Sequence, residues 1–369
     1  MTNAFLTPAG EIPWWRTNLG PAERAGALAA IDAEHFSHGP ETQALERELA
    51  ATLEVPHVLV TPSGTAALML SLIALGVRPG DRVIVPTRNF IAAAHAAWLL
   101  GAKVDLVDCR PDRPVVNAEQ VIERITDQTR AIIVVHLAGR GVDVEAIRKV
   151  ADKRGISVVE DACQGLFSRR PNGRHLGTLG STGCFSFGMA KIVSTGIGGA
   201  VATHDSVIKD KLMMARNHGV ADIISHQYLV PGFNFRFSDV LSGIGLAQFA
   251  RRAEKEAHCL AIYRRYAEGL AGLPFISIVP VDIDQGEVPQ WVEVMSPMRD
   301  RIMQYLADKS VQTRRFVPCL HSAPHLATGE SFPNSERFSA QGFVLPSGPS
   351  QPLENVDRVI ELLAAYPER

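Results

Sequence analysis

The chain has 369 residues, of which 46% are hydrophobic and 21% are charged, and its formal net charge is −2. This composition is that of an ordinary globular protein with a large apolar core and about two domains. A charge so close to neutral excludes a general attraction to nucleic acid or to an anionic membrane, so a phosphate-bearing ligand would have to be held by local groups.

The five cysteines are dispersed, odd in number and without a C-x-x-C pair, so we expect reduced structural thiols and no metal site. Residues 1–19 have neither the basic start nor the apolar stretch of a secretory signal. No apolar run approaches the length of a membrane span. These features together predict a cytoplasmic protein.

Short β-branched runs alternate with helical patterns between about residues 57 and 215. The expected strands are 57–60, 82–86, 103–108, 131–136, 156–161, 184–187 and 199–203. Helices are expected to begin after Ser63, Phe90, Asn117, Asp143 and Asp205, most of them good capping residues. This alternation predicts an α/β fold in which crossover units form a mostly parallel sheet, buried on both faces.

The alternation weakens beyond about residue 240, where a long helical pattern runs to residue 270 and leads into a proline-rich region. We therefore expect a large domain with an N-terminal arm over residues 1–245, and a smaller C-terminal α/β domain over residues 246–369.

The loop after the first expected strand is a turn of small residues, Ser63-Gly64-Thr65, that opens a helix. Free backbone N–H groups and the helix dipole at such a turn favour an anion, for example a phosphate. Ordinary capping of the helix is the alternative interpretation of the same residues.

Two further loops carry charges in unusual places. Glu160-Asp161 ends a strand that we expect to be buried, so at least one of the two carboxylates needs a cationic partner. A protonated pyridinium nitrogen would be such a partner. The alternative is that Asp161 only caps the next turn. Lys191 lies among small and apolar residues, where desolvation would lower the pKa of its amine and make it nucleophilic; a lysine of a surface loop is the alternative. Because ligands gather at the carboxyl ends of such strands, these loops are expected to meet.

The small-residue turn, the carboxylate pair and the lysine follow one another along the chain in an order that resembles the DegT/DnrJ/EryC1/StrS family of PLP-dependent sugar aminotransferases. The resemblance rests on residues 63–68 (SGTAAL), 160–164 (EDACQ) and 185–191 (FSFGMAK), with further matches at 37–40, 232–236, 313–314, 320–321 and 345–347. It covers nearly the whole chain and implies a fold-type-I PLP transferase.

The resemblance also implies roles for single residues around pyridoxal 5′-phosphate. Lys191 would form the internal aldimine, a Schiff base, and Asp161 would pair with the pyridine nitrogen. Gln164 would hydrogen-bond near the phenolic oxygen of the cofactor, and Phe90 would stack on the pyridine face.

The cofactor's phosphate would be bound by Ser63, Gly64, Thr65 and Ser186. Asn234 matches a position that reaches the phosphate in the neighbouring subunit, which implies a homodimer with shared active sites.

The implied reaction moves an amino group from an amino acid, glutamate by resemblance, to a keto sugar that we expect to be nucleotide-linked. Arg236, Arg314 and Arg315 are candidates to bind the diphosphate, and His321 is a candidate for the same pocket. Solvated arginines and a structural histidine are the alternative interpretations.

Other functions on the same scaffold remain open at this point. A PLP-dependent lyase or dehydratase is one, although the dehydrating relatives carry a histidine in place of Lys191. A non-catalytic PLP-binding regulatory protein is another, against which the retained Lys191, Asp161 and Gln164 argue. A cysteine desulfurase would need an exposed mobile cysteine, and Cys163 beside Asp161 is poorly placed for that.

Several departures from the family pattern concern the acceptor. They include Gly188-Met189-Ala190 before the lysine, Ile192 after it and Ser181, while Trp14-Trp15 and residues 286–291 are unusual segments. The nucleotide, the aminated carbon and its stereochemistry therefore stay open.

Overall fold

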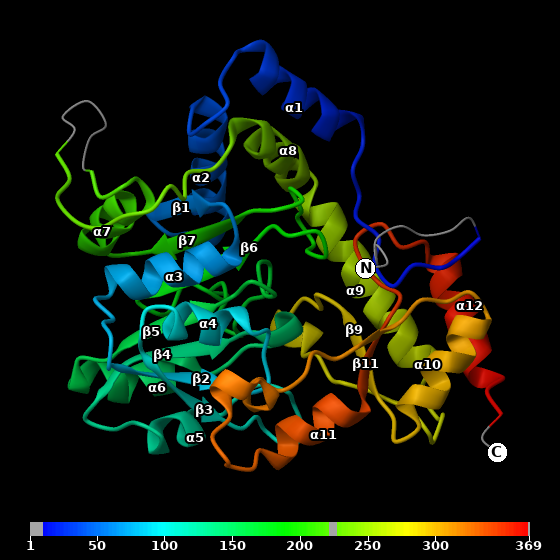
Figure 1. The fold of residues 1–369 in the computed structure, drawn as a ribbon. Helices are drawn as coiled ribbons and strands as arrows, with labels where there is room; N and C mark the ends of the chain where they lie inside the picture. The colour runs from blue at the N-terminus through cyan, green and yellow to red at the C-terminus, as the bar shows by residue number, and fades with distance from the viewer. Residues whose placement is uncertain (1–9, 221–226, 368–369) are drawn as a thin grey trace.

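The computed structural model describes residues 10–220 and 227–367, and a seven-stranded sheet forms its centre (Figure 1). The strand order is β1-β7-β6-β5-β4-β2-β3. The strands are β1 (His57–Thr61), β2 (Arg82–Pro86), β3 (Lys103–Val107), β4 (Thr129–Val135), β5 (Ser157–Asp161), β6 (Thr182–Ser186) and β7 (Gly199–Thr203). All neighbouring pairs are parallel except those of β7, which is antiparallel to both β1 and β6. The predicted α/β sheet is confirmed, with each strand within two residues of its expected ends.

Five helices begin close to the predicted positions and pack around this sheet, namely α3 (Gly64–Ala74), α4 (Ala92–Trp98), α5 (Ala118–Glu123), α6 (Val144–Ala151) and α7 (Ser206–Arg216). Two earlier helices, α1 (Pro21–Asp32) and α2 (Pro40–Leu53), were not predicted. Ser63 Oγ accepts a hydrogen bond from the Ala66 N–H at 3.1 Å, and Asn117, Asp143 and Asp205 cap α5, α6 and α7 in the same way.

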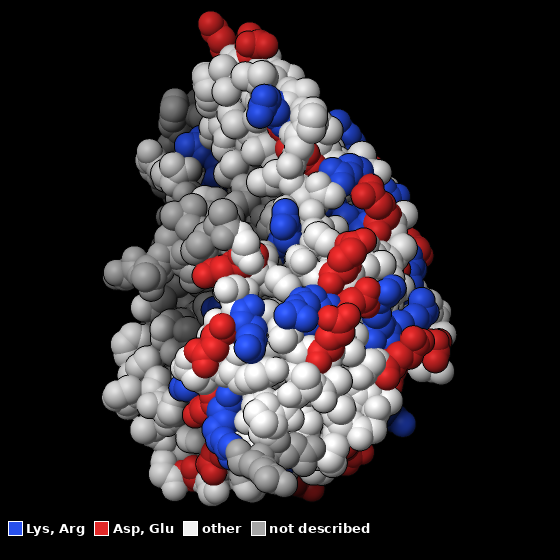
Figure 2. Space-filling view, turned by 90° about the vertical axis from the view of Figure 1, so that its right-hand side faces the viewer, with Lys and Arg blue, Asp and Glu red and all other residues white. Residues whose placement is uncertain are grey.

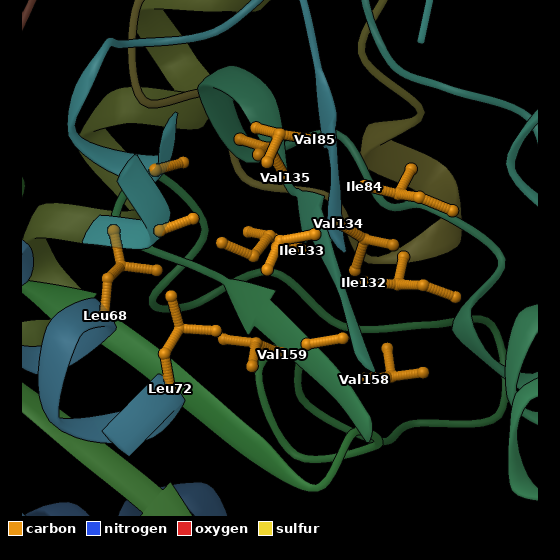
Figure 3. Packing of buried hydrophobic residues seen from close by; sticks show 14 of the residues in the cluster. Leu68, Leu72, Ile84, Val85, Ile132, Ile133, Val134, Val135, Val158 and Val159 are labelled. Carbon is orange, nitrogen blue, oxygen red and sulfur yellow. The ribbon is translucent and has the colours of Figure 1, made fainter. Parts of the chain in front are cut away.

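The core of the sheet consists of the continuous apolar runs that the sequence predicts. Leu68 and Leu72 of α3 point toward Val159 of β5, and Ile133 of β4 lies beside them (Figure 3). These four side chains are at most 1% exposed. Because helices cover both faces of the sheet, neither face needs polar residues, and the strands do not alternate.

A second, antiparallel sheet lies in the C-terminal part of the chain, in the order β10-β11-β9-β8 (Figure 1). Its strands are β8 (Ser277–Ile278), β9 (Val292–Met295), β10 (Arg314–Arg315) and β11 (Gly342–Leu345). The accompanying helices are α10 (Arg299–Asp308), α11 (Pro333–Gln341) and α12 (Leu353–Ala364). The N-terminal segment reaches this part of the molecule, because Ile12 bridges Val311 and Trp15 bridges Ser347. The expected division at residue 245 stays a prediction.

The helical pattern expected from residue 240 to 270 is not one helix. It is split at Arg251, whose φ and ψ of −107° and 15° are not helical, into α8 (Asp239–Ala250) and α9 (Arg252–Gly269). The two helices have different partners, since α8 packs against α1 and α2 while α9 packs against α12.

The surface carries both signs of charge side by side. On the face shown in Figure 2, lysine and arginine side chains alternate with aspartate and glutamate without a large region of one sign. Within residues 10–220 and 227–367, no helix combines the length and the apolar character that crossing a membrane requires.

Candidate active site

A cavity of about 330 Å³ opens at the carboxyl ends of β1, β5 and β6. It brings together most of the residues singled out in the sequence. Those that line it are Ser63, Gly64, Thr65, Phe90, Asp161, Gln164, Ser186, Lys191, Arg314 and Arg315.

Lys191 lies in a turn that other elements hold in place. Its backbone N–H bonds to the Gly188 carbonyl at 3.1 Å, and Gln290 Nε2 donates to the Ala190 carbonyl at 2.7 Å. The amine lies 5.2 Å from the centre of the Trp291 ring. Burial lowers the pKa of Lys191, although the nearby Asp161 acts in the opposite direction. The amine is therefore easier to deprotonate than that of an ordinary lysine.

The two carboxylates at the end of β5 lie on opposite faces of the strand and have different surroundings. Glu160 accepts hydrogen bonds from His136 Nε2 at 2.8 Å and from the backbone N–H groups of residues 177, 179 and 180. Burial opposes its charge, but these donors outweigh burial and lower the pKa of Glu160. Its charge is thus satisfied within the protein.

Asp161 is the carboxylate that faces the cavity. It is 6% exposed, and its Oδ1 accepts a hydrogen bond from the Cys163 N–H at 3.1 Å. Burial raises the pKa of Asp161, although Cys163 and the nearby Lys191 act in the opposite direction. A cation placed in the cavity, such as a protonated pyridine nitrogen, would complete its surroundings.

Gln164 is fixed by a backbone contact. Its Oε1 accepts a hydrogen bond from the Ala138 N–H at 2.9 Å, at a residue that adopts a φ of 52°. With the oxygen engaged in this way, the NH₂ group of Gln164 is the part of the side chain that can donate to a ligand.

The N-terminus of α3 forms a tightly packed cradle. A Cβ atom on Gly64 would lie 2.6 Å from Cys163 Sγ, and one on Gly199 would lie 2.5 Å from the Ser63 carbonyl carbon. Only glycine fits at either position. Ser186 lies at the end of β6 beside this helix end, so backbone N–H groups, the helix dipole and a hydroxyl converge where a phosphate would be held.

Phe90 lies beside the cavity and is 52% exposed, which is unusual for an aromatic side chain. Part of the side chain is thus accessible to a ligand in the cavity. The exposure suits the stacking role that the family resemblance implies.

Three of the predicted site residues lie outside the lining of this cavity. Asn234 is exposed and accepts a hydrogen bond from Arg236 Nε at 3.0 Å. His321 Nδ1 and Thr87 Oγ1 are 2.8 Å apart, and the imidazole packs on Phe332, which is a structural setting for this histidine. The functional roles proposed for these three residues stay predictions.

Two arginines at the cavity have different settings. The Arg314 guanidinium lies 4.8 Å from the Trp14 ring centre, and Arg315 pairs with Asp300 at 3.2 Å. Trp14 and Trp291, from the two segments that are unusual in sequence, both line the cavity.

Sequence reasoning missed Arg88 and Glu293 as cavity residues. Arg88 is only 2% exposed, yet it stands in a loop where a solvated arginine would be expected. The one local signal is its place after a buried strand, two residues before Phe90. Glu293 carries no such signal, because it lies on β9, all of whose residues are buried, and only the packing of the second sheet places it at the cavity.

The geometry defines a class of protein. A lysine with a lowered pKa, a buried carboxylate that forms no ion pair within the described residues, and a helix N-terminus with glycines meet at one edge of a mostly parallel sheet. These residues fit the amine, pyridine and phosphate attachment points of pyridoxal phosphate, which is the arrangement of a fold-type-I PLP enzyme.

Comparison with known proteins identifies the family. Residues 18–364 match the DegT/DnrJ/EryC1/StrS aminotransferase family. The chain is 34% identical to the dTDP-3-amino-3,4,6-trideoxy-α-D-glucose transaminase of Streptomyces venezuelae over 356 residues, which is 94% of this chain and 93% of that protein. The chain belongs to this family and is a PLP-dependent aminotransferase.

Solved structures agree with the fold and the cofactor. S. venezuelae DesV in complex with a ketimine intermediate matches with a TM-score of 0.89 and 32% identity over 94% of each chain. NtdA of Bacillus subtilis with bound PMP matches with a TM-score of 0.86 and 29% identity, over 94% of this chain and 82% of that chain. These relatives disfavour the lyase and regulatory alternatives.

Proposed function

We propose that this enzyme transfers an amino group from an amino acid, with glutamate as the donor, to a keto sugar carried on a nucleotide. The observation that carries the proposal is the meeting of Lys191, Asp161 and the α3 N-terminus at one cavity. The sugar acceptor is supported by the S. venezuelae transaminase, whose name denotes a dTDP-linked amino sugar.

Pyridoxal phosphate, when bound, supplies an aldehyde that condenses with amines and a ring that takes up the electrons released at the substrate carbon. Ser63, Gly64, Thr65 and Ser186 would hold its phosphate at the α3 cradle. The carboxylate of Asp161 would keep the pyridine nitrogen protonated. Phe90 would orient the ring, and the Gln164 NH₂ group would donate to the phenolic oxygen.

Lys191 has two tasks in this proposal. Its amine would hold the cofactor covalently, and after the amino donor has displaced it, the same amine would serve as the base that takes up the proton from the substrate carbon. The lowered pKa of Lys191 suits the task, because a neutral amine is needed to accept that proton.

Arginines at the cavity suit a phosphate-bearing acceptor. The guanidinium of Arg314 packs on Trp14 and that of Arg315 on the exposed Asp300 side chain, so both can reorient toward phosphate oxygens at modest cost. The net charge of −2 gives the chain no general attraction for phosphate, so these local groups would carry the interaction.

We also propose that the enzyme is a homodimer in which Asn234 contributes to the partner's site. Support comes from large apolar side chains that are exposed in the single chain, including Phe36 at 56% and Tyr228 at 77%. A mixture of Lys191→Ala and Asn234→Ala chains would then contain one intact site per mixed dimer. Recovery of activity on mixing, with a dimer in sedimentation, is the expected result; monomers with full activity would contradict it.

A cytoplasmic location belongs to the same proposal. It rests on the five free cysteines, which form no disulfide within the described residues.

The decisive experiment is product analysis with glutamate and a panel of nucleotide-linked keto sugars. We expect 2-oxoglutarate and amino sugar in equal amounts with at least one acceptor. If no acceptor of the panel, free or nucleotide-linked, causes 2-oxoglutarate release, the proposed reaction is wrong.

A further inference from the structure

Arg88 is a buried cation in the wall of the active-site cavity. It follows β2, is 2% exposed and lines the cavity beside Phe90. Its guanidinium packs 4.5 Å from the centre of the Phe316 ring, and Nη1 donates to the Val317 carbonyl at 3.0 Å. Nε is buried and has no hydrogen-bond partner in the part of the chain that the structure describes.

The buried charges around Arg88 do not balance. Glu293 lines the same cavity and is 3% exposed, but its carboxylate pairs with Arg140 Nη1 at 2.5 Å. Glu293 is thus paired with Arg140, and Arg88 forms no ion pair within the described residues. Burial lowers the pKa of Arg88, Glu293 opposes that effect and Arg140 adds to it. A buried cation without its own carboxylate is costly, so this position favours an anion in the cavity.

The two phosphate sites of the proposed function lie elsewhere in the cavity. The cofactor's phosphate is assigned to the α3 cradle, and the exposed Arg314 and Arg315 suit the diphosphate of a nucleotide. Arg88 is too deeply buried to receive a diphosphate. A carboxylate is small and planar, and its two oxygens match the fork of a guanidinium group.

We propose that Arg88 binds a carboxylate of the reacting substrate. This inference rests on the proposed function, and it assigns to the cavity an anion subsite separate from both phosphates. Two molecules could bring the carboxylate, namely the amino donor or a keto sugar that itself bears an acid group, as a uronic acid does. The test below distinguishes them.

The first measurement is calorimetric binding of glutarate to the PLP-loaded enzyme, with neutral glutaramide in parallel. Arg88→Gln should weaken glutarate binding roughly 10- to 100-fold and leave glutaramide unchanged, because it removes a charge-assisted bidentate contact. Arg88→Lys should recover only part of the affinity, since an ammonium group lacks the fork.

Arg337→Gln is the matched control. Arg337 also packs on a phenylalanine, with its guanidinium 4.7 Å from the Phe338 ring centre, and donates to the Pro111 carbonyl, but it is exposed and lies outside the cavity lining. Its substitution should leave glutarate affinity at the wild-type value.

Transamination has two half-reactions: the amino donor first gives its amino group to the cofactor, and the keto sugar then receives it from the cofactor. Measuring each half-reaction by itself shows which molecule brings the carboxylate. If the donor brings it, Arg88→Gln slows the glutamate half-reaction, followed by the cofactor's absorbance. If the acceptor brings it, that half-reaction is unchanged and the variant loses its preference for glucuronate over glucose in binding.

Unchanged affinity for glutarate and for glucuronate in Arg88→Gln would overturn the proposal, as would tighter binding of inorganic phosphate than of glutarate at the same site. Wild-type enzyme that binds neither carboxylate would also overturn it. Should Arg88→Gln not fold, as judged by circular dichroism, Arg88→Lys gives the same comparison. Since these are binding measurements, they remain decisive even if no keto sugar is aminated.

Discussion

At the scale of single residues, the active site depends on how incompletely its charges are compensated. Glu160 receives four hydrogen bonds from the protein, whereas its neighbour Asp161 receives one from the Cys163 backbone and keeps a raised pKa. The unbalanced carboxylate and the desolvated amine of Lys191 face the same cavity. Groups left in this state are typical of functional sites, because structural charges are usually paired.

Lys191→Ala tests the residue at the centre of the proposal. The variant should fold, since it removes a buried amine whose desolvation disfavours its charge, and should lose turnover by roughly 10²- to 10⁴-fold, the usual contribution of a general acid–base group. Borohydride reduction followed by mass spectrometry should find no covalent cofactor. Lys209→Ala, on the surface of α7, is the control. Full activity of Lys191→Ala would disprove the assigned role.

The pKa of Lys191 predicts how cofactor attachment depends on pH. Only the neutral amine attacks an aldehyde, and burial lowers the pKa of Lys191 below the ordinary 10.5. The rate at which apoprotein incorporates pyridoxal phosphate should therefore rise with pH and level off below pH 10.5. Stopped-flow absorbance measures this rate. A midpoint at or above 10.5 would show that the amine is not desolvated.

At the scale of elements, the turn that carries Lys191 is held from several directions. Lys255 of α9 donates to the Ile192 carbonyl at 3.4 Å and to Gln248 Oε1 at 2.8 Å. Gln248 of α8 in turn accepts from the Ser194 N–H and donates to Glu23 of α1. The break at Arg251 allows α8 and α9 to reach the turn from different angles.

Lys255→Met should change the dependence of stability on pH. Burial lowers the pKa of Lys255 to about 8, so between pH 8 and the ordinary value of 10.5 the unfolded chain binds more protons than the native one. The free energy of unfolding contributed by this group thus rises with pH across that window. Urea denaturation of wild type and variant at pH 7.5 and 10 should show a smaller rise in Lys255→Met. Equal rises would contradict the lowered pKa.

Gly199→Ala tests the close contact between β7 and the phosphate cradle. The added methyl group would lie 2.5 Å from the Ser63 carbonyl carbon and 2.6 Å from the Gly64 nitrogen. We expect a loss of about 1–3 kcal/mol in stability and weaker binding of pyridoxal phosphate to the apoprotein. Gly188→Ala is the control for stability, because its nearest contact would be 3.5 Å, an ordinary distance. A Gly199→Ala protein of wild-type stability would show that the backbone at Ser63 and Gly64 can move to accommodate the methyl group.

At the scale of the whole molecule, buried polar contacts join the seven-stranded sheet to the C-terminal part. Arg140 follows β4 and pairs with Glu293 of β9, and it also donates to the carbonyls of Val279 and Pro280. Ser168 Oγ accepts a hydrogen bond from the Val288 N–H at 2.9 Å. The cavity wall is built across this junction, since Asp161 and Lys191 come from one side and Glu293 and Arg314 from the other.

Arg140→Leu should be strongly destabilising. It leaves Glu293 buried without its cation, which usually costs about 3–5 kcal/mol. The double variant Arg140→Leu/Glu293→Leu should regain part of this loss, because the carboxylate that Arg140 compensates is then removed together with it. Urea denaturation of the three proteins measures the effect. A loss below about 1 kcal/mol in Arg140→Leu would show that the junction does not depend on this pair.

The local sequence determined much of this protein. Continuous apolar runs predicted the seven strands, and capping residues such as Ser63 and Asn117 predicted where helices begin, because both signals depend only on near neighbours in the chain. The chemistry of Lys191, Asp161 and the Ser63-Gly64 turn was predictable for the same reason. The carboxyl ends of neighbouring strands meet at one edge, so local motifs were sufficient to place these residues together.

Only the tertiary structure decided the charge balance of the site. Glu160 and Asp161 are equivalent in sequence, and they differ because residues 177–180 fold back to donate to one of them. Arg88 became a buried, unbalanced cation because Glu293, some 200 positions away, pairs with Arg140 instead. Burial and pairing depend on contacts between distant segments, and no local pattern of residues encodes which carboxylate a buried arginine receives.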